Sequence, residues 1–319
     1  MIAREVADAL RDGRAVVALE STLISHGLAY PANVDVAAAS EQAVRAAGAV
    51  PATVAIHGGR VFVGLDESQL EELATAPAGT VRKVARPTMA AALADGGWGA
   101  TTVSATMIAA HAAGIAVFAT GGIGGVHRGA LGGPRADGHG SGGPGADRPT
   151  VPTFDISADL DELARTPVAV VCAGPKAILD VPLTLEYLET RGVPVVAIGV
   201  DDVPGFYARR SGLRAPSFVR DVAGAAAVVR AHRALGLESG LLLCTPVPED
   251  AALGEDETRE AVARAVAEAE DTGVVGPELT PWLLTRIAAL TDGASVRANT
   301  ALIINDARVA GELAVLLAG

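Results

Sequence analysis

Short apolar runs rich in Val, Ile and Ala alternate with amphipathic helical patterns along most of this chain. Near-continuous apolar strands separated by helices are typical of a mostly parallel sheet that is covered on both faces. The pattern predicts strands at residues 15–20, 53–57, 80–84, 115–120, 168–173, 193–200 and 240–245. The sequence therefore predicts an α/β fold with a mostly parallel sheet and helices on both faces.

Helices are predicted between these strands, at residues 33–47, 67–75, 159–165 and 217–235. The C-terminal part shows no strand between its helices, which are predicted at residues 256–271, 281–290 and 296–317. Residues 1–14 have the pattern of a charged amphipathic helix and lack the apolar core of a signal peptide. Residues 96–126 carry no charged Asp, Glu, Lys or Arg, but their Thr, Ser, His and Gly content favours a buried helix followed by a buried strand over a membrane span.

One segment differs from the rest in composition. Residues 131–150 read LGGPRADGHGSGGPGADRPT, which is too rich in Gly and Pro to contribute to a core. We expect a disordered surface insertion within a single domain that spans residues 1–319, and a mobile lid is the alternative.

The overall charge and the cysteines limit the classes of partner and compartment. A net charge of −12 argues against a nucleic-acid surface, which needs a basic footprint, so any anionic ligand must be held by a local group of donors. Cys172 and Cys244 both lie in apolar runs and form no disulfide framework, which favours a reducing cytoplasm. No attachment to a membrane is expected.

Lysine is used very sparingly. Only Lys83 and Lys176 are lysines among the 25 basic residues, and the bias toward Ala, Gly, Arg and Val indicates a GC-rich genome in which arginine replaces lysine wherever either will serve. Arginine cannot replace lysine as a nucleophile or general base, because it stays charged. The two lysines are therefore candidates for chemistry, and retention by chance is the alternative.

Several unusual polar residues lie at the ends of predicted strands. Glu20 and Thr120 each close a strand, Lys83 lies near the end of another, and Lys176 follows a fourth at a Gly-Pro turn. Ligands of open parallel sheets bind at the carboxyl ends of the strands, so we expect a single site there. Lys176 could act as a nucleophile when neutral, with Lys83 as a neighbouring cation or phosphate ligand. Ordinary surface charges are the alternative for both.

Two further motifs could add ligands to such a site. The run TGGIGGVHRG at residues 120–129 has five glycines and matches neither the dinucleotide nor the P-loop spacing, so a phosphate cradle and a purely structural turn both remain open. In FDISADL, Asp155 has the pattern of a helix N-cap, and Asp159 falls in the first turn. Both carboxylates could instead hold a hard cation, partly through water.

Four segments of the chain closely resemble the pseudouridine-5′-phosphate glycosidases, a family also named after indigoidine synthase A. They read ALESTLISHGLAYPAN, GATTVSATMIAAHAAGIAVFATGGIGGVHRGA, DISADLDELARTPVAVVCAGPKAILDVPLTLEYLETRGVPVV and ANTALIIND. The resemblance implies an α/β homotrimer that reversibly splits pseudouridine 5′-phosphate into uracil and ribose 5-phosphate. Because a uracil carbon is a poor leaving group, two carboxylates would not suffice, and the implied mechanism uses a lysine adduct with the ring-opened sugar.

The resemblance also implies roles for individual residues. Lys176 matches the nucleophile, Glu20 the proton donor, and Asp155 the ligand of a manganese ion (Mn²⁺). The implied substrate-binding positions are Lys83, Val103, Thr120, His127, Ser157, Ala158, Asp159 and Asn299.

Three positions depart from the family pattern. Pro175 precedes the lysine, Ala85-Arg86-Pro87 stands in place of Ser-Arg-Arg, and Asp306 stands where a second Asn is common. The lysine and the phosphate-binding residues alone would also permit a Schiff-base lyase of the aldolase kind acting on another sugar phosphate. A non-catalytic phosphosugar sensor is the other alternative, although binding alone needs neither Lys176 nor Glu20.

Overall fold

The computed structural model describes residues 1–132, 152–274 and 279–319. Within them, ten strands form one sheet at the centre of an α/β fold. In sheet order, nine of these strands are β11 (Ser217–Val219), β10 (Val195–Ile198), β12 (Leu241–Cys244), β8 (Ala169–Cys172), β6 (Val117–Ala119), β1 (Val16–Leu19), β2 (Val50–His57), β5 (Gly99–Thr101) and β4 (Arg82–Val84). The tenth, β3 (Arg60–Val63), pairs with β2.

The sheet is mostly parallel, as predicted. All neighbouring strands from β11 to β2 run in the same direction, whereas β2 pairs antiparallel with β3 and β5. A separate antiparallel pair is formed by β7 (Val126–His127) and β9 (Leu179–Asp180). The carboxyl ends of β1, β6 and β8 consequently lie side by side at one edge of the sheet.

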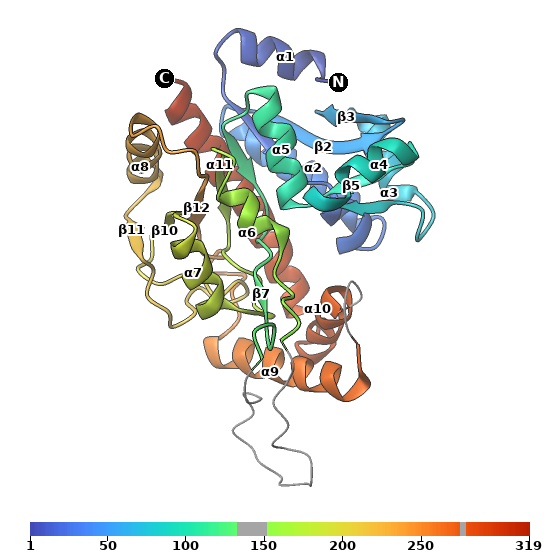
Figure 1. The fold of residues 1–319 in the computed structure, drawn as a ribbon, viewed down its shortest axis with the longest axis vertical. Coiled ribbons are helices and arrows are strands. Elements are labelled where there is room, and N and C mark those ends of the chain that lie inside the picture. The colour runs from blue at the N-terminus through green and yellow to red at the C-terminus, as the bar shows by residue number, and fades with distance from the viewer. Residues whose placement is uncertain (133–151, 275–278) are drawn as a thin grey trace, which may run out of the picture.

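Helices cover both faces of this sheet (Figure 1). One face packs against α1 (Arg4–Arg11), α5 (Val103–Ala113), α6 (Ala158–Leu163) and α7 (Val181–Thr190). The other face packs against α2 (Ala32–Ala46), α8 (Val222–Ala234) and α11 (Ala294–Ala318). Successive residues of a strand alternate between the two layers: Ala18 of β1 packs in the first, and Val17 and Leu19 pack in the second. Because both layers are apolar, these strands read as continuous apolar runs.

The C-terminal part is helical, as predicted. It comprises α9 (Glu255–Thr272), α10 (Leu279–Leu290) and α11, which share an apolar cluster. Figure 1 shows α9 and α10 at one end of the molecule, with α11 running from them along the sheet toward the opposite end. The remaining elements before α5 are two smaller helices and two short turns: α3 (Glu67–Thr75), α4 (Met89–Asp95), a π-turn (Leu23–Gly27) and a 3₁₀ turn (Arg86–Thr88).

Two predicted elements were partly wrong. The helix expected at residues 217–235 begins only at Val222, because 217–219 form β11, which pairs with β10 at the edge of the sheet. Asp221 separates the two elements by capping α8, where its side chain accepts a hydrogen bond from the N–H of Gly224 at 2.9 Å. In residues 96–126, the strand β5 precedes the expected helix. The insertion predicted at residues 131–150 lies outside the described residues, apart from its first two positions.

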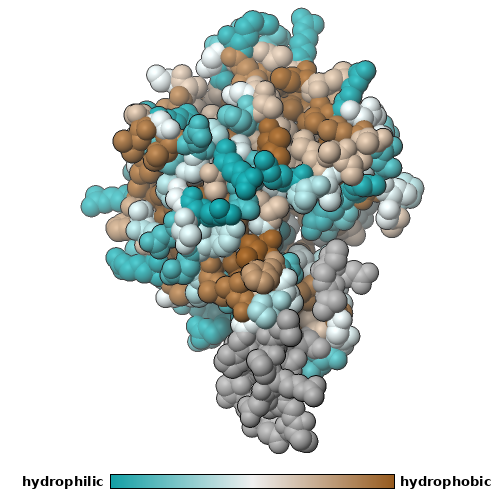
Figure 2. Space-filling view, viewed as in Figure 1, coloured by the Kyte–Doolittle hydropathy of each residue, from teal (hydrophilic) through white to brown (hydrophobic). Residues whose placement is uncertain are grey.

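Three observations concern the described surface and the two cysteines. None of the described helices has the length and apolar character needed to cross a membrane. Figure 2 shows hydrophilic residues between smaller hydrophobic patches over the visible face. Cys172 and Cys244 are free and buried, and they lie opposite each other on β8 and β12.

Asp306 of α11 is an unusual component of the core. It is 0% exposed, and neither carboxyl oxygen has a hydrogen-bond partner in the described part of the chain. Burial raises the pKa of Asp306 well above its usual range, and Cys172 adds to the rise. The nearby N–H of Ala173 opposes this rise in pKa, but without hydrogen-bonding geometry. The carboxyl group therefore keeps its proton to higher pH in the folded protein than an ordinary aspartate does.

This protonation makes the stability depend on pH. An unfolded Asp ionises at about pH 4, whereas folded Asp306 ionises only at its raised pKa. Between these two pH values the folded state binds one proton more than the unfolded state, so the free energy of unfolding falls as the pH rises. Asp306→Asn has no ionisable group at this position, so this loss of stability with rising pH should disappear. We expect the variant and the parent protein to unfold at similar denaturant concentrations near pH 4 to 5, and the variant to be increasingly the more stable toward pH 8. A difference that stays constant over this range would contradict the assignment.

Candidate functional site

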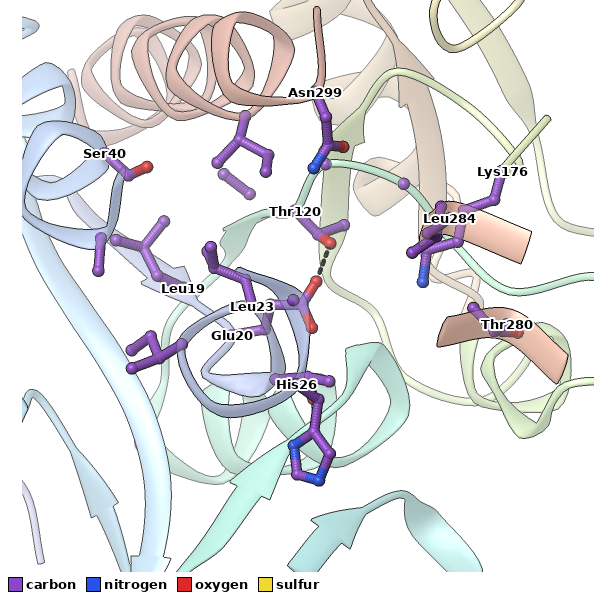
Figure 3. Close-up of a pocket in the computed structure, with 18 of the residues that line it drawn as sticks. Leu19, Glu20, Leu23, His26, Ser40, Thr120, Lys176, Thr280, Leu284 and Asn299 are labelled. Atoms are coloured by element: carbon purple, nitrogen blue, oxygen red, sulfur yellow. Dashed lines mark hydrogen bonds between the residues drawn. The ribbon is translucent and has the colours of Figure 1, made fainter. Parts of the chain in front are cut away.

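The carboxyl ends of β1, β6 and β8 bound a pocket of about 280 Å³. Glu20 follows β1, Thr120 follows β6, and Lys176 lies in the loop after β8. Lys83 of β4 and Asn299 of α11 also line the pocket. Figure 3 shows Glu20, Thr120, Lys176 and Asn299 around the same space. The structure thus brings together the polar residues that the sequence placed at the ends of separate strands.

Hydrogen bonds between two loops hold the backbone of Lys176 in place. Beyond β6 and β8, the N–H of Ala173 donates to the carbonyl of Gly121 at 3.0 Å, and the N–H of Ile123 donates to Gly174 at 3.1 Å. The N–H of Lys176 then donates to the carbonyl of Ile123 at 3.2 Å. Gly174 has a φ of 91°, which a side chain would disfavour. The Lys176 loop therefore continues the parallel pairing of the two strands.

The glycines of the 120–129 run allow close packing in this region. A Cβ atom on Gly122 would lie 2.5 Å from Cε2 of Phe206 and 2.9 Å from the carbonyl oxygen of Gly174. A Cβ atom on Gly124 would lie 2.9 Å from Oδ2 of Asp159. The N–H of Gly124 already donates to that carboxylate, at 2.9 Å. These contacts favour the structural interpretation of Gly122 and Gly124 over that of a phosphate cradle.

Glu20 has the properties of a proton donor. Its carboxyl group accepts a hydrogen bond from the hydroxyl of Thr120 (Figure 3). Burial raises the pKa of Glu20, while the charge of Lys176, the Thr120 hydrogen bond and the charge of Lys83 oppose the rise. Glu20 consequently holds a proton at higher pH than an ordinary glutamate does.

Lys83 supplies positive charge at the mouth of the pocket. Its side chain is accessible to solvent, yet the protein packed around the ammonium group lowers its pKa, and the charge of Lys176 lowers it further. The pKa of His26, which lines the same pocket, is lowered by burial and by the charge of Lys83. This end of the pocket can attract an anion even though the chain as a whole is acidic.

Asp159 joins three segments beside the pocket. Its carboxylate accepts hydrogen bonds from the N–H of Ser104 at 3.0 Å, at the start of α5, and from Gly124 at 2.9 Å. The Ser157 hydroxyl accepts a hydrogen bond from the N–H of Asp159 at 3.2 Å and caps α6. Val103, the first residue of α5, directly precedes Ser104.

Asp155 is not the helix cap that the sequence suggested, because Ser157 takes that position two residues later. The Asp155 side chain is 49% exposed, and its carboxylate lies 3.9 Å from Nδ1 of His127. Burial lowers the pKa of His127, whereas Asp155 raises it. Within the described ranges, no three or more His, Cys, Asp or Glu side chains are grouped to hold a metal ion. A hard cation bound at Asp155 would take its other ligands from water or from a substrate phosphate.

Arg86 lies in the segment Ala85-Arg86-Pro87, which departs from the family pattern on either side of this arginine. Its guanidinium donates to the carboxylate of Glu162 at 2.5 Å, and Glu162 also accepts a hydrogen bond from Thr166. The Glu162 side chain is only 1% exposed, so Arg86 compensates a buried charge. The N–H of Arg86 donates to the Ser104 hydroxyl at 3.1 Å. Arg86 therefore has a structural partner outside the pocket lining, whereas Lys83 lines the pocket.

The implied site residues fall into two neighbouring groups. The first group lines the pocket and comprises Glu20, Lys83, Thr120, Lys176 and Asn299. The second lies outside its lining and comprises Val103, His127, Asp155, Ser157, Ala158 and Asp159. Among the other lining residues are four that the sequence did not predict as site residues: His26, Phe206, Thr280 and Leu284. Only His26 had a signal in the sequence, since it lies in the loop after Glu20.

Comparison with known proteins identifies relatives over the full length of the chain. The family described as indigoidine synthase A like protein matches residues 5–316. A pseudouridine-5′-phosphate glycosidase of Paracoccus denitrificans is 52% identical over 314 residues, which cover 98% of this chain and 97% of the relative. Another of the same name, from Caldanaerobacter subterraneus subsp. tengcongensis, is 49% identical over 316 residues, which cover 99% of this chain and 96% of the relative.

Solved structures share the fold. The prealnumycin C-glycosynthase AlnA, in complex with ribulose 5-phosphate, superposes with a TM-score of 0.85 at 38% identity, covering 100% of this chain and 96% of that chain. An indigoidine synthase A-like protein from Thermotoga maritima superposes with a TM-score of 0.81 at 31% identity, covering 96% of this chain and 94% of that chain.

The contacts of Asp159 predict that a conservative substitution there lowers the stability of the protein. In Asp159→Asn, an NH₂ group faces one of the two N–H groups that the carboxylate now binds, so we expect the free energy of unfolding to fall by about 1–3 kcal/mol. Asp161→Asn, in the same helix, disrupts surface ion pairs with Arg165 and Arg191 and should cost at most about 1 kcal/mol. Denaturant unfolding of both variants measures the difference. Equal effects would show that Asp159 does not join the loops.

Proposed function

This chain belongs to the family of indigoidine synthase A like proteins, and we propose that it is a pseudouridine-5′-phosphate glycosidase. It then cleaves the C-glycosidic bond of pseudouridine 5′-phosphate reversibly to give uracil and ribose 5-phosphate. The observation that carries the proposal is the meeting of Lys176, Glu20 and Lys83 in one pocket. The homotrimer that the resemblance implies belongs to the same proposal.

The proposed reaction needs a nucleophile stronger than water, because the leaving group is a carbon atom. In our proposal, the neutral amine of Lys176 forms a bond to C1′ while the bond between C1′ and the ring oxygen breaks, and the proton that the nitrogen loses passes to that oxygen. The nitrogen lone pair then expels uracil and leaves an iminium at C1′, which water hydrolyses to ribose 5-phosphate. The pairing of the Lys176 loop with the glycine run supports this role, since it fixes the nucleophile relative to Glu20 and Thr120.

Uracil leaves with the electron pair of the broken bond, and its ring carbon must take up a proton. Glu20 supplies that proton in our proposal. Its raised pKa keeps it protonated nearer to neutral pH, and the hydroxyl of Thr120 fixes its orientation. In the synthetic direction, Glu20 would remove the same proton from the ring carbon.

The phosphate of the substrate is assigned to the Lys83 end of the pocket. Lys83 carries the charge that a phosphate requires and has no ion-pair partner in the described part of the chain. Val103, Ser157, Ala158 and Asp159 lie outside the pocket lining, at the starts of α5 and α6, and would shape this end. Asp155 would hold the manganese ion, which would neutralise phosphate charge and help to orient the substrate, and His127, whose Nδ1 lies 3.9 Å from that carboxylate, would contact the substrate.

A direct assay tests the function. Purified protein with uracil, ribose 5-phosphate and Mn²⁺ should form pseudouridine 5′-phosphate, which is followed by absorbance and confirmed by mass. A Schiff-base lyase of another sugar phosphate would leave uracil unchanged, and a sensor would bind ribose 5-phosphate without turnover.

The two lysines should differ in their tolerance of arginine. Lys176→Arg keeps the charge but cannot lose a proton at neutral pH, so we expect turnover to fall by at least about a thousandfold. Lys83→Arg keeps a positive charge next to the phosphate, so turnover should persist. The KM for ribose 5-phosphate should rise about tenfold, equivalent to roughly 1.4 kcal/mol.

Borohydride reduction in the presence of ribose 5-phosphate, followed by peptide mapping, locates the adduct. The sugar should be found on Lys176 in the parent protein and in Lys83→Arg. A sugar on Lys83, or near-normal turnover of Lys176→Arg, would overturn the assignment of roles.

A divalent cation at Asp155 should be needed for turnover. Chelation should abolish uracil release, and Mn²⁺ should restore it in the parent protein but not in Asp155→Ala at the same concentration. Binding of Mn²⁺ measured by electron paramagnetic resonance should weaken in that variant, because a carboxylate ligand is lost. Asp161→Ala serves as the control for a general change in surface charge. Full activity of Asp155→Ala in chelator would show that Asp155 holds no required metal.

A further inference from the structure

Phe206 has a backbone conformation that side chains rarely adopt. Its φ is 65°, in the left-handed region, which is a genuine outlier for a bulky residue. The two other described non-glycine residues with positive φ, Phe154 and Asp292, are exposed, whereas Phe206 is only 3% exposed. Such strain persists where the surroundings enforce it, and it is concentrated at functional sites. Phe206 lines the same pocket as Lys176.

The loop around Phe206 is tied down on both sides. The N–H of Val203 donates to the carbonyl of Leu213 at 2.8 Å, and the N–H of Ser211 donates to Val203 at 3.1 Å. At the turn itself, the N–H of Gly205 donates to Ala208 at 3.0 Å. The ring of Tyr207 meets the ring of Phe206 edge-on, with centroids 4.8 Å apart. The position of the Phe206 ring is therefore set by the fold before any ligand binds.

The ring lies on the glycine run beside the Lys176 loop. Cε2 of Phe206 occupies the space that a side chain on Gly122 would need, and the carbonyl of Gly174 closes that space from the other side. Phe206 also shares an apolar cluster with Leu284 and Ile303, which line the pocket too. This apolar wall contrasts with the charged groups around Lys83 and Glu20.

The apolar side of the pocket suits the base of the proposed substrate, and the charged side suits its ribose phosphate. Phosphate and ribose are charged or rich in hydroxyl groups, and they match the end that holds Lys83 and Glu20. The base is planar, and an aromatic or aliphatic wall is the usual partner for such a ring. Asn299, one turn before Ile303 on α11, adds an amide that presents one acceptor and donors to the edge of a pyrimidinedione.

We propose that Phe206 is a specificity-determining residue whose ring contacts the uracil base beside Lys176. This inference rests on the proposed function and extends it by assigning the base to the Phe206 wall. The ring takes no part in bond breaking. It positions the ring carbon of uracil next to C1′, so its loss affects uracil while ribose 5-phosphate still binds.

The experiment measures the two substrates separately in the direction of synthesis. For Phe206→Leu, we expect the KM for uracil to rise about tenfold, because a base–aromatic contact is lost. The KM for ribose 5-phosphate should stay within about twofold, and borohydride should trap the sugar on Lys176 as in the parent protein. Phe218→Leu makes the same change on β11, where Phe218 is exposed, and should alter neither KM.

Two results would overturn the inference. An unchanged KM for uracil in Phe206→Leu would show that the base does not contact the ring. A parallel loss of uracil use and of sugar trapping would show that Phe206 only supports the Lys176 loop. If the parent protein itself made no pseudouridine 5′-phosphate, the proposed function would fail before any variant was compared.

Discussion

The placement of Lys176 depends on the backbone pairing between residues 121–124 and 173–176. The segments that follow β6 and β8 continue to exchange hydrogen bonds after the strands end, so the lysine is carried by an extension of the sheet. Other segments pack closely against Gly121 and Gly122 and leave no room for side chains at these two positions. A Cβ atom on Gly121 would meet Ile303 at 2.8 Å, and one on Gly122 would meet Phe206 at 2.5 Å. Gly121 and Gly122 therefore allow the packing that fixes the position of Lys176.

The charges of the pocket are arranged so that each group changes the proton affinity of its neighbour. Burial raises the pKa of Glu20, and the two lysines limit that rise. Burial and the charge of Lys176 lower the pKa of Lys83, while Glu20 opposes the lowering. A pocket of this kind can hold a proton and a positive charge within one small volume. The acidity of the whole chain does not prevent this, because nearby charges dominate at short range.

The sequence predicted those features that a single segment encodes. Buried strands of the parallel sheet read as apolar runs, and the polar residues that follow them marked the site. Features that depend on contacts between distant segments were missed. β11 lies within a helical pattern and forms only because β10 pairs with it at the edge of the sheet. Asp155 had a capping pattern, but Ser157 takes the cap. Phe206 gave no signal, because its importance comes from a backbone angle and from its contact with Gly122.

The helix α6 shows how a short element can hold the site together. Its Asp159 binds the start of α5 and the glycine run, and its Glu162 binds Arg86, two residues beyond β4. The segment that follows Lys83 is therefore anchored to the same helix that binds the glycine run, and the glycine run pairs with the Lys176 loop. A buried carboxylate without its partner would be strongly unfavourable, so Glu162 and Arg86 need each other. The segment Ala85-Arg86-Pro87 thus retains the one basic residue that the fold requires there, whereas Lys83 lines the pocket.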